Sequence, residues 1–215
     1  MARGLHRRPL ARASATHREE QQVLRSLIAG TRRGAGATAE QAKSIDEQCR
    51  VLEGFLLEDE RVDPWSTGEV SGRWNVLYTT EKDTKSLDPF LSREEDHPIF
   101  QVVDTEAGTI VNTIRMRAGL SLSAEAPLEL VRPNRIKYFF EFFDVALLGG
   151  LLKLPRIPVG SRRIGGWSDT VYYCMNMSMN DTKEEAGEAG EETLRILRNF
   201  RKDLIVLERE NGASS

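Results

Sequence analysis

The chain has 215 residues, of which 40% are hydrophobic and 29% are charged, and its formal net charge is −3. This length and apolar content suit one domain with appended helices. The slightly negative charge excludes a chain-wide basic surface for nucleic acid. The longest apolar run, from Val145 to Leu152, is too short to span a bilayer. We therefore expect a soluble or peripheral protein with no nucleic-acid partner.

The charge is unevenly distributed along the chain. Residues 1–18 contain five arginines and no acidic residue, which leaves 25 basic against 33 acidic residues in the remainder. An acid-free start rich in arginine is typical of an organelle transit peptide or its remnant, and a disordered basic tail is the alternative. We expect residues 1–18 to be one of these and residues 210–215 to be a disordered tail.

Two amphipathic helices are predicted within residues 19–60. Thr16 and Glu19 have the spacing of a capping box, and Gly30 ends the first helix. The second helix begins at Thr38, with Gln41 at the capping-box position. Its apolar face comprises Ala42, Ile45, Cys49, Leu52, Phe55 and Leu56. The two helices should form a hairpin whose apolar stripes pack on each other and on one end of a barrel.

From Gly72 onward the hydrophobic period is that of β-strands. Trp74, Val76 and Tyr78 alternate with other residues and are expected on one face of the first strand. Further strands are expected at 99–104, 109–116, 120–130, 136–145, 170–180, 194–200 and 203–209. Strands with no helices between them predict an antiparallel sheet, closed into a barrel or folded as a sandwich.

The Gly-x-Trp at the start of this all-β region favours the barrel. Gly72 lets the backbone bend, and Trp74 can plug the closed end of the core. We expect a mainly β protein in which residues 70–209 form a lipocalin-like antiparallel β-barrel, preceded by an N-terminal α-helical hairpin at residues 19–60.

The strand predicted at 136–145 is aromatic on both faces. Tyr138, Phe140 and Phe142 are expected on one face, and Phe139 and Phe143 on the other. A strand that is apolar on both faces needs a cover on its outside, which the helices, a partner or lipid can provide.

Two segments interrupt the strands. Residues 145–160 are apolar and contain glycine and proline, which predicts a lid over a cavity or a loop that dips into a lipid surface. Residues 181–192 are acidic and predict a solvated insertion. The proposed membrane-contact residues of the first segment are Leu147, Leu148, Leu151, Leu152 and Leu154.

No motif points to catalysis, a metal or a cofactor. The three histidines lack metal-ligand spacing, and Cys49 and Cys174 are isolated, so they are expected in the core. The glycines of 34–39 follow a predicted helix and not a strand, so they do not indicate a dinucleotide site. The carboxylates on the predicted strands show no acid–base spacing. We therefore expect a protein that is not an enzyme.

Several short motifs occur in a characteristic order within residues 19–209. They are SGRWNVLYT at 71–79, FQVVD at 100–104, RPNR at 132–135, GW at 166–167, LRILR at 194–198 and IVLER at 205–209. In this order they resemble the plastid lipid-associated protein family, also called fibrillins. One departure is that VYYC at 171–174 stands where the family has Tyr-Leu-Asp.

The resemblance implies a noncatalytic lipid-binding protein of the plastid (chloroplast), in the stroma or on plastoglobules or thylakoids. Its partners would be a hydrophobic small molecule or lipid, such as a prenylquinone or carotenoid, and a peripheral membrane or lipid-droplet surface. The alternative is a structural or assembly protein that docks a protein partner through the barrel exterior and helices and carries no lipid.

We assign candidate site residues to this reading. The expected cavity or core residues are Trp74, Tyr78, Phe100, Phe140, Phe142 and Trp167. Four arginines are expected to hold a polar head group or to structure the barrel rim, namely Arg132, Arg135, Arg195 and Arg198.

Overall fold

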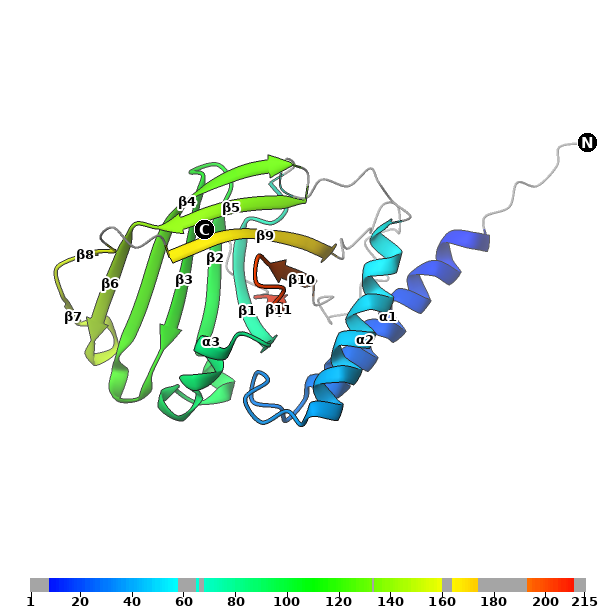
Figure 1. The fold of residues 1–215 in the computed structure, drawn as a ribbon, viewed down its shortest axis with the longest axis horizontal. Helices are drawn as coiled ribbons and strands as arrows, with labels where there is room; N and C mark the ends of the chain where they lie inside the picture. Colours follow the sequence, from blue (N-terminus) through cyan, green and yellow to red (C-terminus); the bar gives the residue numbers. More distant parts are fainter. Residues whose placement is uncertain are drawn as a thin grey trace, which may run out of the picture.

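Two long helices precede a β-barrel (Figure 1). The computed structural model describes residues 8–57, 65, 68–132, 134–159, 164–173 and 193–210. The barrel strands are β1 (Gly72–Thr79), β2 (Ile99–Asp104), β3 (Thr109–Arg115), β4 (Ser121–Arg132), β5 (Arg135–Phe140), β9 (Ile164–Tyr173), β10 (Leu194–Asn199) and β11 (Leu204–Arg209).

The eight strands form a closed antiparallel ring. Their order is β3-β2-β1-β11-β10-β9-β5-β4, and β4 pairs again with β3. Each neighbouring pair is antiparallel. The predicted mainly β fold, with a barrel and an N-terminal helical pair, is therefore confirmed.

A second group of strands extends the sheet at one side of the barrel. β6 (Phe142–Leu147) continues from β5 and pairs with the first half of β4, while β5 pairs with the second half. Two short strands, β7 (Leu152–Lys153) and β8 (Ile157–Pro158), add to the outer edge of β6. These three strands form the left edge of the molecule in Figure 1.

Short helical turns lie in three of the connections. Between β1 and β2 the chain forms α3 (Lys82–Ser86), η1 (Asp88–Phe90) and η2 (Glu94–Asp96). η3 (Arg117–Gly119) joins β3 to β4, and η4 (Leu148–Gly150) follows β6.

The helical hairpin largely follows the predicted signals. α1 (Arg8–Ile28) begins earlier than Thr16, and Gly30, at φ +74°, follows its end. The capping box of α2 (Ala39–Leu57) is confirmed, because the backbone N–H of Gln41 donates to Thr38 Oγ1 at 3.1 Å and Gln41 Oε1 accepts from the N–H of Thr38 at 3.0 Å. No helix among the described residues combines the length and apolarity needed to cross a bilayer.

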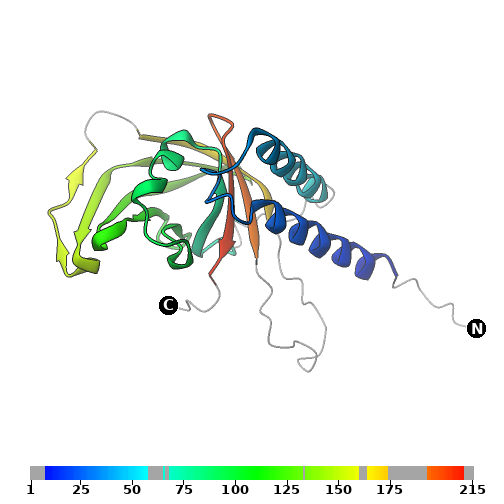
Figure 2. The same ribbon diagram turned by 90° about the horizontal axis from the view of Figure 1, so that it is seen from below.

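The hairpin packs on the outside of the barrel, beside β10 and β11 (Figure 2). Leu24, Ile45 and Leu52 of the helices share one apolar cluster with Ile196 and Val206 of the strands. Two sets of ion pairs border this cluster: Arg25 pairs with Glu208, and Arg198 pairs with Asp46 at 2.9 Å and Glu53 at 2.7 Å. The helices are therefore fixed to the barrel wall.

Two irregularities in the strands reverse faces that alternation predicts. The register shifts between Val76 and Tyr78, so Trp74 and Val76 point into the barrel while Tyr78 packs under the helices. A break at Glu141 separates β5 from β6 and shifts their register on β4 by one residue, so Phe143 points inward and Phe142 outward. The predicted single strand at 136–145 is wrong for this reason, because one extra residue moves every following side chain to the other face.

Candidate functional site in the barrel interior

One half of the barrel interior is filled by its own side chains. Strand register places one set of buried residues on the inner face: Trp74, Val103, Ile110, Ala126, Ile136, Tyr173, Leu197 and Leu207. Trp65 and Val70, which precede β1, belong to the same cluster. The indole N–H of Trp74 donates to the carbonyl of Val70 at 2.8 Å, and that of Trp65 to Thr170 Oγ1 at 2.9 Å. We call this region the filled half.

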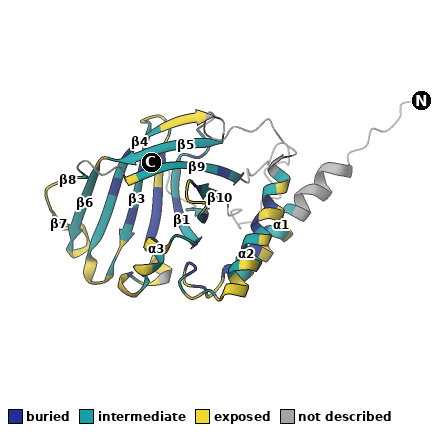
Figure 3. Ribbon diagram, viewed as in Figure 1, coloured by how far each residue is buried: buried dark blue, intermediate teal, exposed yellow. Residues whose placement is uncertain are grey.

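The other half keeps an accessible apolar wall. Most of its inward-facing side chains are half-buried: Val76, Ile114, Leu122, Tyr138, Phe140, Phe143, Val145 and Ile205. Ile99, which pairs with Ile114, is buried, and Val76, Tyr138, Phe140 and Ile205 pack against the cluster of the filled half. β6 and the neighbouring ends of β3 and β4 are accordingly drawn mostly as intermediate in Figure 3. These inward-facing side chains keep part of their apolar surface exposed, so we call this region the open half.

A polar layer lies where the two halves meet. Gln101 pairs with Trp74 across β1 and β2 and with Asn112 across β2 and β3, so all three side chains point inward. The amide Nε2 of Gln101 donates to Asn112 Oδ1 at 2.9 Å. Gln101 Oε1 in turn accepts a hydrogen bond from Nη2 of Arg195 on β10. The layer therefore spans the barrel between strands that are not neighbours.

Arg195 is the charged member of this layer and is fully buried. Its guanidinium lies 4.4 Å from the ring centroid of Trp74 and 5.6 Å from that of Trp65. Its Nε and Nη1 have no hydrogen-bond partner in the described structure. Burial lowers the pKa of Arg195 to about 9, which still leaves the side chain protonated at neutral pH.

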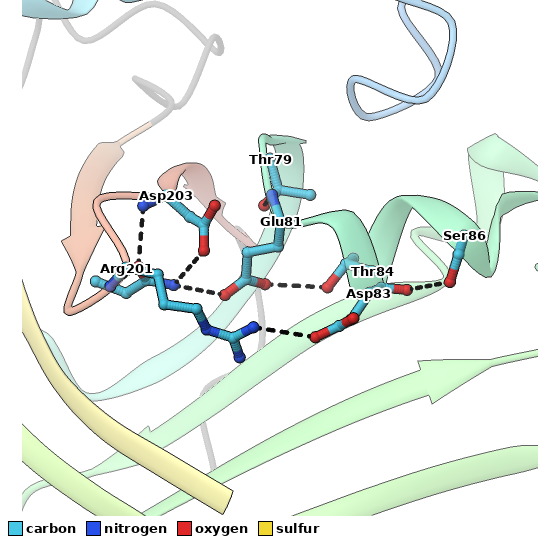
Figure 4. A network of polar contacts seen from close by, with 8 residues as sticks. Thr79, Glu81, Asp83, Thr84, Ser86, Arg201 and Asp203 are labelled. Atoms are coloured by element: carbon cyan, nitrogen blue, oxygen red, sulfur yellow. Dashed lines mark hydrogen bonds and ion pairs between the residues drawn. The ribbon is translucent and has the colours of Figure 1, made fainter.

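A polar network closes one rim of the barrel, between the β1–β2 connection and the β10–β11 turn (Figure 4). Glu81 accepts hydrogen bonds from Thr84 Oγ1 at 3.0 Å and from Asn199 Nδ2 at 2.9 Å, and Arg201 donates to Asp83 at 3.2 Å. Burial, with a smaller contribution from Asp203, raises the pKa of Glu81. Burial is the main cause of a raised pKa of Tyr138, and the charge of Glu81 adds to it. The network lies at the ends of β1 and β10 and the starts of β2 and β11, so this rim borders the open half.

The structure places the six expected cavity residues in different parts of the barrel. Trp74 lies in the filled half and Phe140 in the open half. Tyr78 lies under the helices, and strand register places the other three on the outer face: Phe100, Phe142 and Trp167. The prediction that all six share one interior is wrong. The register shift beside Leu77 accounts for Tyr78 and the break at Glu141 for Phe142, whereas the outward faces of Phe100 and Trp167 follow from the pairing of β2 and β9 with their neighbours.

The outer aromatic rings are covered by cations of the chain itself. Arg73 lies 3.8 Å from the Phe100 centroid, Arg135 3.9 Å from Trp167, and Arg156 4.9 Å from Phe142. Guanidinium groups stack favourably on aromatic faces. The outer face therefore obtains part of its cover without a partner.

The expected rim arginines have different positions. Arg135 pairs with Asp169 at 2.6 Å on the outer face, and Arg198 pairs with α2. Arg195 is the one that reaches the interior, and the side chain of Arg132 lies outside the described residues. Sequence reasoning missed Gln101 and Asn112, whose inward positions follow only from the pairing of β1, β2 and β3.

The apolar segment after β6 is exposed. Leu151 is 89% exposed and Leu148 65%, while Leu152 and Leu154 are 49% and 40% exposed; Leu147 is half-buried. Ile157 and Ile164 nearby are 49% and 44% exposed. Large apolar side chains gathered on one edge mark a surface that interacts with a partner or a lipid phase.

A separate pocket of about 230 Å³ lies outside the barrel, between the end of α1 and the start of β2. It is lined by Arg25, Arg33 and His97 together with apolar residues. Because Arg25 pairs with Glu208 and Arg33 with Asp88, the pocket has little uncompensated charge. Within the described residues, no cluster of three or more His, Cys, Asp or Glu side chains could hold a metal ion.

Comparison with known proteins identifies the family. The PAP_fibrillin family model matches residues 18–180, which is well over half of the chain. The chain belongs to this family, the plastid lipid-associated proteins or fibrillins. Neither the curated proteins nor the solved structures compared give a match. Of the six motifs that carried the resemblance, those at 71–79, 100–104, 132–135 and 166–167 lie inside the matched segment of this fibrillin, and those at 194–198 and 205–209 follow it.

Proposed function

We propose that this fibrillin is a noncatalytic plastid protein that binds a prenylquinone, a carotenoid or a related lipid in the open half of its barrel. The observation that carries the proposal is the half-buried inner wall, which offers apolar surface to a ligand without unfolding the filled half. Burying a prenyl chain there is favourable by about 25 cal/mol per Å² of apolar surface.

The same proposal places the protein on a plastoglobule or thylakoid surface through its leucine edge. Leu148, Leu151, Leu152 and Leu154 expose apolar side chains close together in the sequence. A loop of this kind can insert its side chains at the boundary between head groups and acyl chains. Because β6 contributes Phe143 and Val145 to the open half and leads directly into this edge, a lipid could pass from the surface to the inner wall over a short path.

Native mass spectrometry of the protein purified from its own organism tests the binding proposal. We expect a mass above that of the chain, and organic extraction should release a prenyl lipid. The matched variant is Leu122→Phe, which adds volume to the open half and should reduce the bound fraction. A mass equal to that of the chain, with no extractable lipid, would contradict the proposal and favour docking of a protein partner.

A further inference from the structure

The buried guanidinium of Arg195 has fewer hydrogen-bond acceptors than donor nitrogens. Its exposure is 0%, and one neutral amide oxygen, Gln101 Oε1, accepts a hydrogen bond from it. Within the described structure, its Nε and Nη1 donate to nothing, and no carboxylate pairs with it. By contrast, Arg135 and Arg198 on the barrel wall each pair with a carboxylate.

An unpaired buried cation is costly. Charged groups are normally buried only with an opposite charge or with their hydrogen bonds satisfied. Stacking on Trp74 and Trp65 recovers part of the cost through cation–π attraction, but the ring faces offer no acceptor for the two remaining nitrogens. The missing element is an oxygen atom that accepts hydrogen bonds.

The position of Arg195 indicates where such an oxygen would come from. Its partner Gln101 is bonded to Asn112, which is half-buried and points into the interior two residues before Ile114 of the open half. Tyr138 lies on the same inner face and packs against the cluster of the filled half. A head group that reaches Arg195 from the open half would therefore approach past Asn112.

We propose that Arg195 binds the oxygen head group of the lipid at the inner end of the open half, with the apolar chain running along the wall towards the leucine edge. The inference rests on the proposed function, since it requires that the barrel holds a lipid. It specifies the ligand class: a chain whose head carries an acceptor oxygen, either a carboxylate or a quinone carbonyl. A hydrocarbon without such a head would leave the two nitrogens unpaired and bind less tightly.

Isothermal titration with three probes tests the head-group preference. Dodecanoate and a decyl-substituted benzoquinone carry acceptor oxygens, whereas dodecyltrimethylammonium carries the same kind of chain with a cationic head. We expect the wild type to bind dodecanoate at least about tenfold more tightly than the ammonium probe, as one charged hydrogen bond provides. Comparison of dodecanoate with the quinone then separates the two sources of the acceptor.

The variant Arg195→Gln should weaken dodecanoate binding by about tenfold or more and leave the ammonium probe unaffected or slightly tighter. The matched control is Arg198→Gln on the same strand, whose side chain pairs with α2 outside the barrel and should not alter either affinity. Equal binding of the anionic and cationic probes by the wild type, or unchanged dodecanoate binding in Arg195→Gln, overturns the inference while lipid binding stands. Failure of the wild type to bind any probe removes the proposed function as well.

A second measurement needs no substitution at Arg195. In a ¹H–¹⁵N spectrum of the wild type, the Nε–H resonance of a buried arginine exchanges slowly and can be followed during titration. We expect the Arg195 resonance to shift as dodecanoate saturates, and that of Arg198 to stay in place. A binding isotherm without any shift at Arg195 contradicts the inference even if Arg195→Gln fails to fold.

Discussion

The filled and open halves of the barrel are built from the same eight strands and the same alternation of side chains. In the filled half, Trp65, Trp74 and Ile136 belong to one buried cluster. In the open half, the first part of β4 pairs with β6 in place of β5, and the inward-facing Phe143 and Val145 of β6 are only half-buried. Alternation within each strand therefore decides which side chains point inward. How deeply those side chains are buried depends on the strand with which each segment pairs.

The largest difference between the halves should appear when an inward aromatic residue is removed. Trp74→Ala deletes a fully buried side chain and should lower the free energy of unfolding by about 3–5 kcal/mol. Phe143→Ala should cost about 1 kcal/mol, because its side chain is already partly exposed. Urea unfolding of both variants checks this. Similar costs would mean that the two halves are packed alike.

A smaller difference should appear when volume is added. Ala126→Leu places extra methyl groups in the filled half and should destabilise the protein by about 1–3 kcal/mol. Leu122→Phe adds volume to the open half, where the side chain is only half-buried, and should leave the urea midpoint nearly unchanged while it reduces lipid binding. Strong destabilisation by Leu122→Phe would show that the open half has no free space.

Glu81, at the rim of the open half, should make the stability of the protein depend on pH. Burial raises the pKa of Glu81 above its ordinary value of 4.5, so the folded state binds this proton more readily than the unfolded state does. The charged carboxylate therefore costs stability above its raised pKa, and this cost disappears as the pH falls towards 4.5. Glu81→Gln should raise the melting temperature by a few degrees at pH 7 and by less at pH 5.

The control for this measurement is Asp83→Asn, since Asp83 is 84% exposed and belongs to the same network. We expect Asp83→Asn to give no comparable gain in melting temperature at pH 7. A gain from Glu81→Gln that is the same at both pH values would mean that burial of the charge is not its cause.

The leucine edge should have the smallest effect on stability and a clear effect on surface binding. Leu151→Glu combined with Leu154→Glu should leave the melting temperature unchanged, because both side chains are exposed. The same variant should no longer float with phosphatidylcholine vesicles. The control is Val23→Glu combined with Val51→Glu. These two side chains lie on the helices, away from the leucine edge, and are 45% and 46% exposed. Unchanged flotation of the leucine variant would exclude this edge as the contact surface.

The candidate site could be predicted in part. The sequence named Phe140 and Arg195 as candidate site residues, and the structure places both side chains on the inner face of the barrel. It could not place Tyr78 and Phe142, since a single extra residue beside Leu77 or at Glu141 reverses every face beyond it. The outward face of Trp167 became clear only from the pairing of β9 with β5. Gln101 belongs to a motif that supports the family resemblance, but neither it nor Asn112 could be given a place in the interior until their strands were paired.

The sequence by itself determined the element types, most of their boundaries and the family. Local signals suffice for these, because capping boxes, turn residues and the two-residue period act between neighbours in the chain. Only the tertiary structure decided that the ring closes between β3 and β4, that the helices cover β10 and β11, and that Arg195 is buried without an anion. These depend on contacts between distant segments, and a local pattern does not encode which strands meet or how much space remains between them.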